Sequence, residues 1–403
     1  RQMYNSKKEK NYLWIFFTML SIGLGQSLVF TSIPILAREN GLSEVQVSLI
    51  FSISATAWFI TSPLWGRYSD KYGPRIIAII GCLGYSANMI LIILPIYLFE
   101  NGVLAGSMLL PLLILSRISY GIFGSATRPA LFGYAGKISS PKERANIFSN
   151  LESGFVIGTV LGPIIGAFFF RYVNNELPFI LFGVLGLIIA TQLNIRLRNE
   201  KEFKLSHKKA MRLKIHDSKV WPYVFVSSIF SITQAIIFQT LGFFIFDKLN
   251  YNVIDAAVYV SISFGIYSTS VVITQSFLNP LFNSIKVMIL VGPILCMLSF
   301  IFMTFANDIF SLTGALMLNG IGYGITRPSY ATALSLSHKK IYQSSAAGLL
   351  GSTYPIGHMI APLFISLYVF DFSLVYYLSA FMCFISVAFT FFHPHILKSS
   401  AYE

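Results

Sequence analysis

The chain has 403 residues, of which 55% are hydrophobic and only 11% are charged. A soluble domain typically holds about 25% charged residues, so this composition excludes a water-soluble globular protein and predicts an integral membrane protein. The net charge of +13 would suit nucleic acid, but the basic residues gather in loops on one side of the predicted membrane spans, so we expect no nucleic-acid partner.

Twelve apolar runs of about 20 residues, the length that crosses a bilayer, follow one another along the chain. The first run continues past signal-peptide length, so we interpret it as a span and not as a cleaved leader. Three cysteines within these runs indicate neither a disulfide framework nor a metal cluster. The predicted spans lie near 12–37, 45–65, 76–99, 108–134, 145–170, 178–195, 221–246, 255–278, 286–306, 309–335, 344–369 and 374–397.

The loops on the two sides of these spans differ in charge. If both termini lie on one side, that side collects most of the 29 Lys and Arg residues. The opposite loops then hold only Arg38, Arg171 and Lys248. The positive-inside rule therefore predicts that both termini are cytoplasmic, in a multi-pass protein of the cell inner (cytoplasmic) membrane.

One long hydrophilic segment, residues 196–219, divides the spans into two sets of six. It is rich in Lys and Arg, and we interpret it as a basic cytoplasmic linker. The sequence thus predicts an all-α membrane fold of twelve transmembrane helices. They form two pseudo-symmetric six-helix bundles, at 1–195 and 220–403.

The two halves also repeat short motifs. "ATRPA" at 126–130 recurs as "ITRPS" at 325–329, and the same offset of 199 residues pairs Gly158 with Gly357. A second alignment sets Gln26 opposite Gln234. Six-span repeats indicate a transporter built from two bundles around a site near the membrane midplane.

Three segments resemble motifs of one transporter family. The loop Gly66–Arg75, "GRYSDKYGPR", resembles the signature loop of the major facilitator superfamily. Arg117–Ala126 resembles the fourth-helix motif of that family, and Gly154–Gly166 resembles the fifth-helix motif of exporters and drug:proton antiporters. The resemblance covers nearly the whole chain and implies transport by alternating access between two bundles.

The loop between the second and third spans is short and basic. A tight turn needs glycines for unusual backbone angles, and Asp70 is the only acid among the bases there. The resemblance implies a conformational latch formed by Gly66, Asp70, Gly73 and Arg75, while a basic hairpin that anchors two helices is the alternative.

The fifth span carries glycines at every fourth position: Gly154, Gly158, Gly162 and Gly166. They line one helix face and let another helix approach closely, and Pro163 can bend the span. The resemblance implies that this packing also gates the cavity towards the cytoplasm.

Charged groups inside spans are costly and mark ion or substrate paths. Arg117, Gly121, Gly124 and Arg128 fall at i, i+4, i+7 and i+11, which predicts one basic face on the fourth span. The resemblance ties the position of Arg117 to proton transfer. Arg128 and its repeat mate Arg327 either bind an anionic substrate or snorkel to the interface and pair with loop acids.

Glu152 is the only acid well inside a span, and it points away from the glycine face. Apolar surroundings favour its protonated form and a nearby arginine favours its charged form, a balance that suits a proton carrier. The alternative is a fixed pair with an arginine that holds the fourth and fifth spans together. His358 either assists proton coupling or bonds to another helix.

Other polar side chains interrupt the apolar spans, and each either lines the substrate cavity or makes hydrogen bonds between helices. These residues are Gln26, Gln234, Gln239, Asn319, Tyr323, Tyr330 and Tyr354.

The chain contains no phosphate-binding loop and no G-x-S-x-G or H-E-x-x-H motif, so we expect neither an enzyme nor a cofactor or metal site. We predict a monomeric, proton-coupled exporter of a small organic molecule. Three helix arginines against one glutamate favour an anionic cargo, such as a carboxylate siderophore or organic acid. A multidrug efflux pump for amphipathic drugs and a non-transporting receptor or scaffold are the alternatives.

Overall fold

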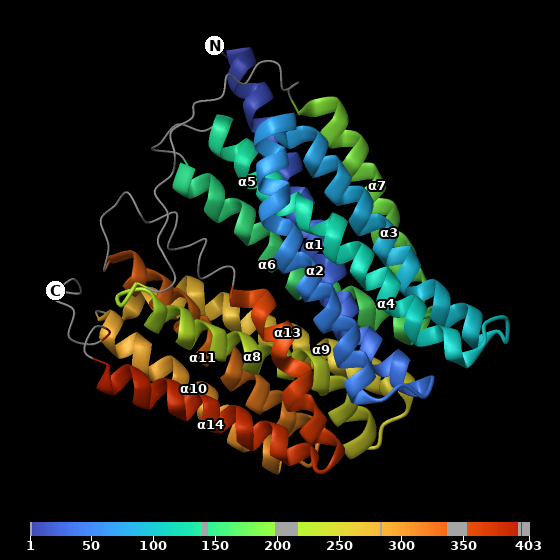
Figure 1. Ribbon diagram of the computed structural model, residues 1–403, viewed down its shortest axis with the longest axis vertical. Helices are drawn as coiled ribbons and strands as arrows, with labels where there is room; N and C mark the ends of the chain where they lie inside the picture. The colour runs from blue at the N-terminus through green and yellow to red at the C-terminus, as the bar shows by residue number, and fades with distance from the viewer. Residues whose placement is uncertain are drawn as a thin grey trace. The chain divides into compact units, whose positions relative to one another are not determined.

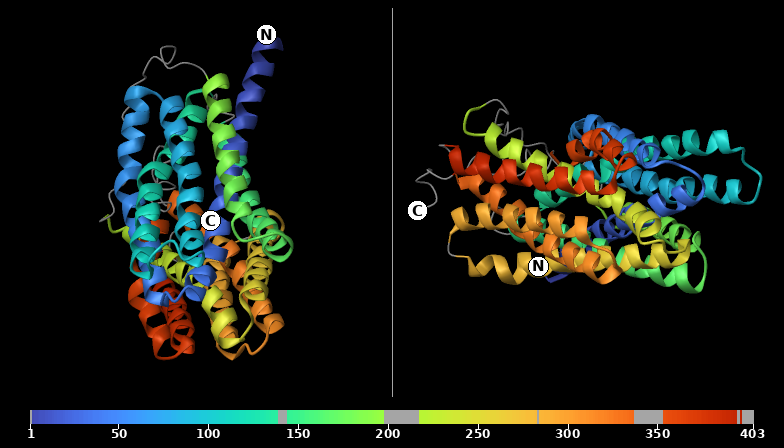
Figure 2. Two further views of the ribbon diagram at one scale, coloured as in Figure 1. Left: turned by 90° about the vertical axis from the view of Figure 1, so that its right-hand side faces the viewer. Right: turned by 90° about the horizontal axis from the view of Figure 1, so that it is seen from below.

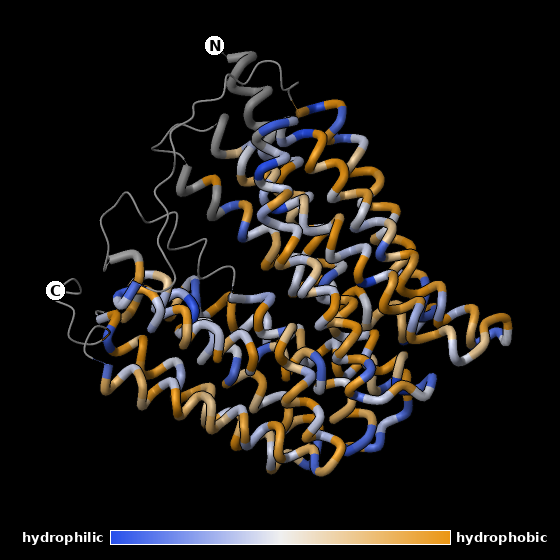
Figure 3. Tube along the Cα trace, viewed as in Figure 1, coloured by the Kyte–Doolittle hydropathy of each residue, from blue (hydrophilic) through white to orange (hydrophobic). Residues whose placement is uncertain are grey.

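The computed structural model describes residues 2–138, 144–197, 217–282, 284–336, 353–393 and 396, and all regular secondary structure in these residues is helical (Figure 1). Eleven helices of the described part are long and apolar enough to cross a membrane, and a twelfth apolar helix, Thr353–Val369, is shorter. Hydrophobic residues run along the helices of both halves (Figure 3). The predicted all-helical membrane fold is confirmed.

The chain divides into two compact units, residues 1–207 and 208–403. A 3₁₀ turn, η1 (Gly124–Ala126), joins α4 to α5, and the two helices together make the fourth span. The other described helices of the first unit each match one predicted span. The helices are α1 (Gln2–Glu39), α2 (Glu44–Tyr72), α3 (Pro74–Glu100), α4 (Gly106–Phe123), α5 (Thr127–Ile138), α6 (Arg144–Tyr172) and α7 (Leu177–Arg196).

The second unit starts its first span at α8. Two of its helices continue into π-helical segments, α8 into η3 (Phe244–Lys248) and α9 into η4 (Thr274–Leu278). Most of the predicted linker and the first part of the predicted eleventh span lie outside the described residues. The helices are α8 (Trp221–Phe243), α9 (Val253–Ile273), α10 (Ile285–Phe305), α11 (Ile309–Leu336), α13 (Thr353–Ile365) and α14 (Phe372–Phe392).

Local signals set several helix ends. The Ser43 hydroxyl accepts a hydrogen bond from the Gln46 backbone, and the Gln46 side chain accepts one from the Ser43 backbone, so a capping box starts α2. Asp371 caps α14, and hydrogen bonds from Ser373 hold the pKa of its carboxyl below the usual range. These caps satisfy backbone groups that the helices leave open at their ends.

The repeat seen in the sequence recurs in the packing. Within the first unit, α1 packs on α6, α2 on α4, and α3 on α4 and α7. Within the second unit, α8 packs on α13, α9 on α11, and α10 on α11 and α14. Figure 2 shows the helices of each unit running alongside one another. The two bundles therefore share one design.

Glycines at equivalent positions allow the same helix packing in both units. A Cβ on Gly121 would overlap the Ser54 carbonyl of α2, and a Cβ on Gly320, 199 residues later, would overlap the Tyr267 carbonyl of α9. Each unit thus brings its fourth and second spans together at a glycine.

The glycine face of α6 lies against α1. A Cβ on Gly158 would overlap the Leu20 carbonyl and the Leu24 amide, and Gly154 and Gly162 meet the same helix one turn away on either side. In the second unit Gly357 meets α8 in the same way. The expected close approach is therefore present, and a gating role for this face stays a prediction, as it does for the buried Pro163 and Gly166.

Gly66 does not lie in the loop between the second and third spans, where the sequence predicted it. α2 continues to Tyr72, so Gly66 lies inside a helix and not in the turn, with the Pro129 side chain 4.0 Å from a Cβ built on it. Gly73 alone supplies the unusual angle, with φ at 99°. Arg75 donates to the Asn194 side chain of α7 at 2.6 Å, and the Asp70 side chain lies outside the described residues.

We expect Gly158→Ala to destabilise the first unit by about 1–3 kcal/mol, because the new methyl group would push α6 away from α1. The control is Gly314→Ala, since a Cβ at Gly314 of α11 meets no atom within 4 Å. Thermal unfolding in detergent should show a lower Tm for the first variant and an equal or higher Tm for the second. Equal Tm values for both variants would contradict the close packing.

Candidate functional site

Two charged side chains meet between the fourth and fifth spans. Nη2 of Arg128, on α5, forms an ion pair with Oε1 of Glu152, on α6. The arginine side chain is 35% exposed and the glutamate side chain 44%. The guanidinium also lies over the ring of Phe155, 5.2 Å from its centroid. Both side chains of the pair are therefore partly exposed, and the Phe155 ring covers part of the guanidinium.

Arg117 lies in a different environment. Its side chain is buried, and Nη1 is 3.5 Å from the Asn88 side-chain oxygen of α3. The rings of Tyr120 and Phe51 lie 4.8 Å and 5.5 Å from its guanidinium carbon. The cation is thus held by an amide and two aromatic faces.

The expected single basic face on the fourth span is wrong. The η1 turn has about three residues per turn instead of 3.6, so it rotates α5 relative to α4. Gly121 faces α2, a Cβ on Gly124 would meet the Tyr120 ring, and Arg128 faces α6. Arg117 and Arg128 therefore have separate partners.

Gln234 and Asn319 form the centre of a buried network in the second unit. The Tyr267 hydroxyl donates to the Gln234 side-chain oxygen. Gln234 donates to Asn319 at 3.1 Å, and Asn319 donates to the Ser299 hydroxyl at 2.8 Å. The network joins α9, α8, α11 and α10, so its geometry is that of bonds between helices. Gln26, half-buried on α1 of the first unit, has no part in it.

A second buried contact joins α8 to α13. Gln239 Nε2 lies 3.0 Å from Nδ1 of His358, and the Tyr354 ring lies 5.2 Å from the imidazole. His358 is 3% exposed. This arrangement fits the bonding role proposed for His358, and nothing in it tests a role in proton coupling.

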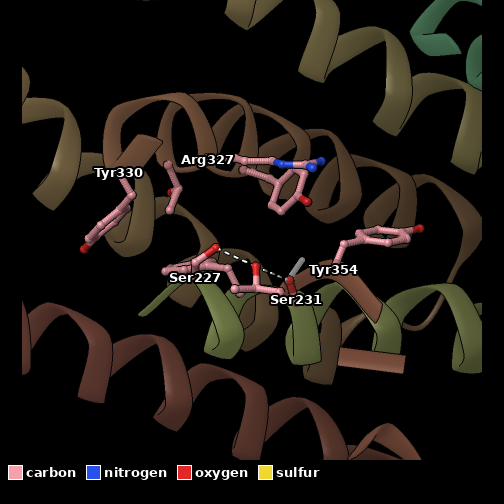
Figure 4. A pocket seen from close by; sticks show the side chains of 9 residues that line it. Ser227, Ser231, Arg327, Tyr330 and Tyr354 are labelled. Carbon is pink, nitrogen blue, oxygen red and sulfur yellow. Dashed lines mark hydrogen bonds between the residues drawn. The ribbon is translucent and has the colours of Figure 1, made fainter. Parts of the chain in front are cut away.

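The second unit also contains a small pocket, which includes four of the predicted substrate residues. Arg327 lies on one side of it, facing Ser227 and Ser231, and Tyr354 lies at one end (Figure 4). The guanidinium carbon is 5.9 Å from the centroid of the Tyr354 ring. The lining residues are Ser227, Phe230, Ser231, Tyr323, Thr326, Arg327, Tyr330, Thr353 and Tyr354.

The hydroxyl of Tyr330 points away from this pocket (Figure 4). Its hydroxyl hydrogen-bonds to the Thr390 hydroxyl at 2.7 Å and lies 3.4 Å from the Ile289 carbonyl. Tyr330 therefore ties α11 to α14 and α10.

Sequence reasoning missed the small hydroxyl residues of the pocket. Ser227 and Ser231 lie one helical turn apart on α8, and Thr353 hydrogen-bonds to Ser227 at 2.8 Å. The i, i+4 spacing of two serines in an apolar span was the signal that could have found them. The described residues contain no group of three His, Cys, Asp or Glu side chains placed to hold a metal ion.

Twelve apolar spans in two repeated bundles of the described residues, with charged and polar side chains inside the spans, define the class of multi-pass membrane transporters. The sequence model described as "Major Facilitator Superfamily" matches residues 15–362, and the chain belongs to that superfamily. It is accordingly a secondary transporter and not an enzyme.

Named relatives and solved structures agree with this assignment. The chain is 24% identical over 361 residues to the quinolone resistance protein NorA of Staphylococcus aureus strain COL, covering 88% of each. It is 24% identical over 374 residues to an uncharacterised transporter of the same superfamily from Methanocaldococcus jannaschii, covering 88% of this chain and 90% of the relative.

Two crystal structures have the same fold. A bacterial homologue of the human lysosomal transporter Spinster, in an inward-facing and unoccupied conformation, matches with a TM-score of 0.75 at 13% identity, covering 98% of each chain. A POT family transporter in complex with 5-aminolevulinic acid matches with a TM-score of 0.73 at 14% identity, covering 96% of each chain.

We expect Asn319→Ala to destabilise the second unit by about 1–3 kcal/mol, because it removes the acceptor for the Gln234 side-chain nitrogen and the donor to the Ser299 hydroxyl. Thr332→Val is the control, since the exposed Thr332 hydroxyl bonds only within its own helix in the structure. Thermal unfolding in detergent measures both. An unchanged Tm for Asn319→Ala combined with lost transport would show that the network binds substrate instead.

Proposed function

We propose that this secondary transporter is a proton-coupled antiporter that exports a small organic molecule from the cytoplasm, with both of its termini on the cytoplasmic side. The observation that carries the proposal is the ion pair between Arg128 and Glu152. It is an ion pair between two helices that belong to the predicted fourth and fifth spans.

The pair can act as a switch between two transport states. While Glu152 is charged, it attracts Arg128 and holds α5 and α6 together. A proton on Glu152 removes its charge and most of this attraction, so the two helices are free to separate. Because both side chains are partly exposed, a proton can reach the carboxylate without unfolding of the bundle.

Several observations support export over import. The glycine-rich face of α6 resembles that of exporters, and it packs closely on α1. The relative from Staphylococcus aureus is named for quinolone resistance, a property that export of a drug explains. Drug efflux is therefore the second candidate function for this chain. Membership of a transporter superfamily argues against a receptor or scaffold.

The helix arginines bear on the charge of the cargo. Of the three helix arginines, Arg128 is paired with Glu152 and Arg117 is buried between aromatic rings. Arg327, which lines the pocket of the second unit, favours an anionic cargo over a cationic one. Nothing in the chain singles out a siderophore.

We expect Glu152→Gln to abolish transport driven by a pH gradient, because an amide cannot carry a proton. Exchange of cargo at equal concentrations should continue, since the variant stays able to bind and reorient. Proteoliposomes with a panel of cationic drugs and citrate-type siderophores would measure both activities. The control is Glu176→Gln, which removes a carboxylate just before α7. A pH dependence that survives in Glu152→Gln contradicts the proposal.

The response to membrane potential gives the charge of the cargo. Exchange of one proton inward for one monoanion outward moves two charges, worth about 4.6 kcal/mol at 100 mV, whereas exchange for a monocation moves none. We therefore expect a potential that is negative on the cytoplasmic side to accelerate export without any pH gradient. Export that ignores this potential would identify the cargo as cationic.

A further inference from the structure

The pocket of the second unit is rich in hydrogen-bond donors. Its lining combines one guanidinium, that of Arg327, with the hydroxyls of Ser227, Ser231 and Thr353. None of the nine lining residues carries a carboxylate. Such a set of groups favours a ligand that brings negative oxygen atoms.

The internal repeat indicates what kind of group this is. Arg128 is the repeat mate of Arg327, and in the first unit it pairs with the carboxylate of Glu152. The same offset of 199 residues places Gly351 at the position that matches Glu152. The second copy of the motif therefore keeps the arginine but lacks the acid.

We infer that the pocket around Arg327 binds an oxyanion, in the first place the carboxylate of the transported molecule. The ligand carboxylate would lie beside Arg327 as the carboxylate of Glu152 lies beside Arg128 in the first unit. This inference rests on the proposed transport function, and it names the substrate class and the residues that recognise it.

The shape of the pocket limits what enters it. Between the lining side chains there is room for about one water molecule. Since the pocket is partly open, a carboxylate that displaces such a water would leave the rest of its molecule beyond the mouth. Arg327 is itself exposed and can adjust its position.

Aromatic rings flank the charged side chain. The centroid of the Tyr354 ring lies 5.9 Å from the Arg327 guanidinium carbon, and Phe230 and Tyr323 also line the pocket. The planar guanidinium of an arginine can meet both oxygens of a carboxylate with its N–H groups. A lysine at this position would keep the charge but lose the paired hydrogen bonds.

Binding to the full-length protein in detergent, with no pH gradient, tests the inference. The probes are benzoate, 1-naphthoate and citrate, each compared with its uncharged amide. We expect the acids to bind and the amides not to bind. Arg327→Gln should weaken the acids about 10- to 100-fold, Arg327→Lys less, and the control Lys219→Gln not at all.

Ser231→Ala provides a second variant in case Arg327→Gln does not fold, and we expect it to weaken the acids several-fold. If no acid binds in a way that depends on Arg327, or if acids and amides bind equally, the inference is overturned.

A phospholipid headgroup offers the same oxyanion chemistry from another source. Reconstitution in neutral lipid, with and without phosphatidylglycerol, separates the two sources. Carboxylate binding that phosphatidylglycerol leaves unchanged supports recognition of the cargo. If phosphatidylglycerol abolishes that binding in the wild type, the pocket is a lipid site and the assignment to cargo fails.

The test is independent of proton coupling. Glu152→Gln should bind the acids as the wild type does, because the probe site lies in the other unit. A pH dependence that survives in Glu152→Gln would refute the antiport proposal and leave the pocket assignment intact. Failure of acid binding would refute the pocket assignment and leave the role of Glu152 intact.

Discussion

The apolar interior of a bilayer offers no hydrogen-bond partners, so each polar group inside a span must find its partner within the protein. This constraint accounts for the contacts that connect the helices of each unit. Arg128 pairs with Glu152 across α5 and α6, and Gln234 with Asn319 across α8 and α11. The first contact carries charge, and we propose that a proton on Glu152 opens it, whereas the second contact is neutral.

Close approach of helices is the complementary requirement, because short contacts between spans need small residues. Glycines provide it at equivalent places in the two units, where Gly158 meets α1 and Gly357 meets α8. The units nevertheless differ in charge. The first contains a complete arginine–glutamate pair, and in the second the matching arginine lines a pocket of hydroxyl groups. We regard this asymmetry as the basis of a division between proton coupling and cargo recognition.

Composition and periodicity were sufficient to predict the helical membrane fold and its spans, because apolar length and glycine spacing act locally. Side-chain partners depend on helix rotation, which a 3₁₀ turn can change without a clear signal in the sequence. The η1 turn between Arg117 and Arg128 is one example. The role of Tyr267 in the Gln234 network could not be foreseen either, since a tyrosine in an apolar helix is as often a packing residue.

The central claim is that the proton carried by Glu152 opens its pair with Arg128 during transport. Infrared difference spectroscopy of the reconstituted protein can follow the carboxyl C=O band directly as the pH is lowered. We predict a band that is absent in Glu152→Gln and whose titration follows the same pH curve as transport in the same vesicles. A band that persists in Glu152→Gln, or that titrates over a different pH range from transport, would contradict the claim.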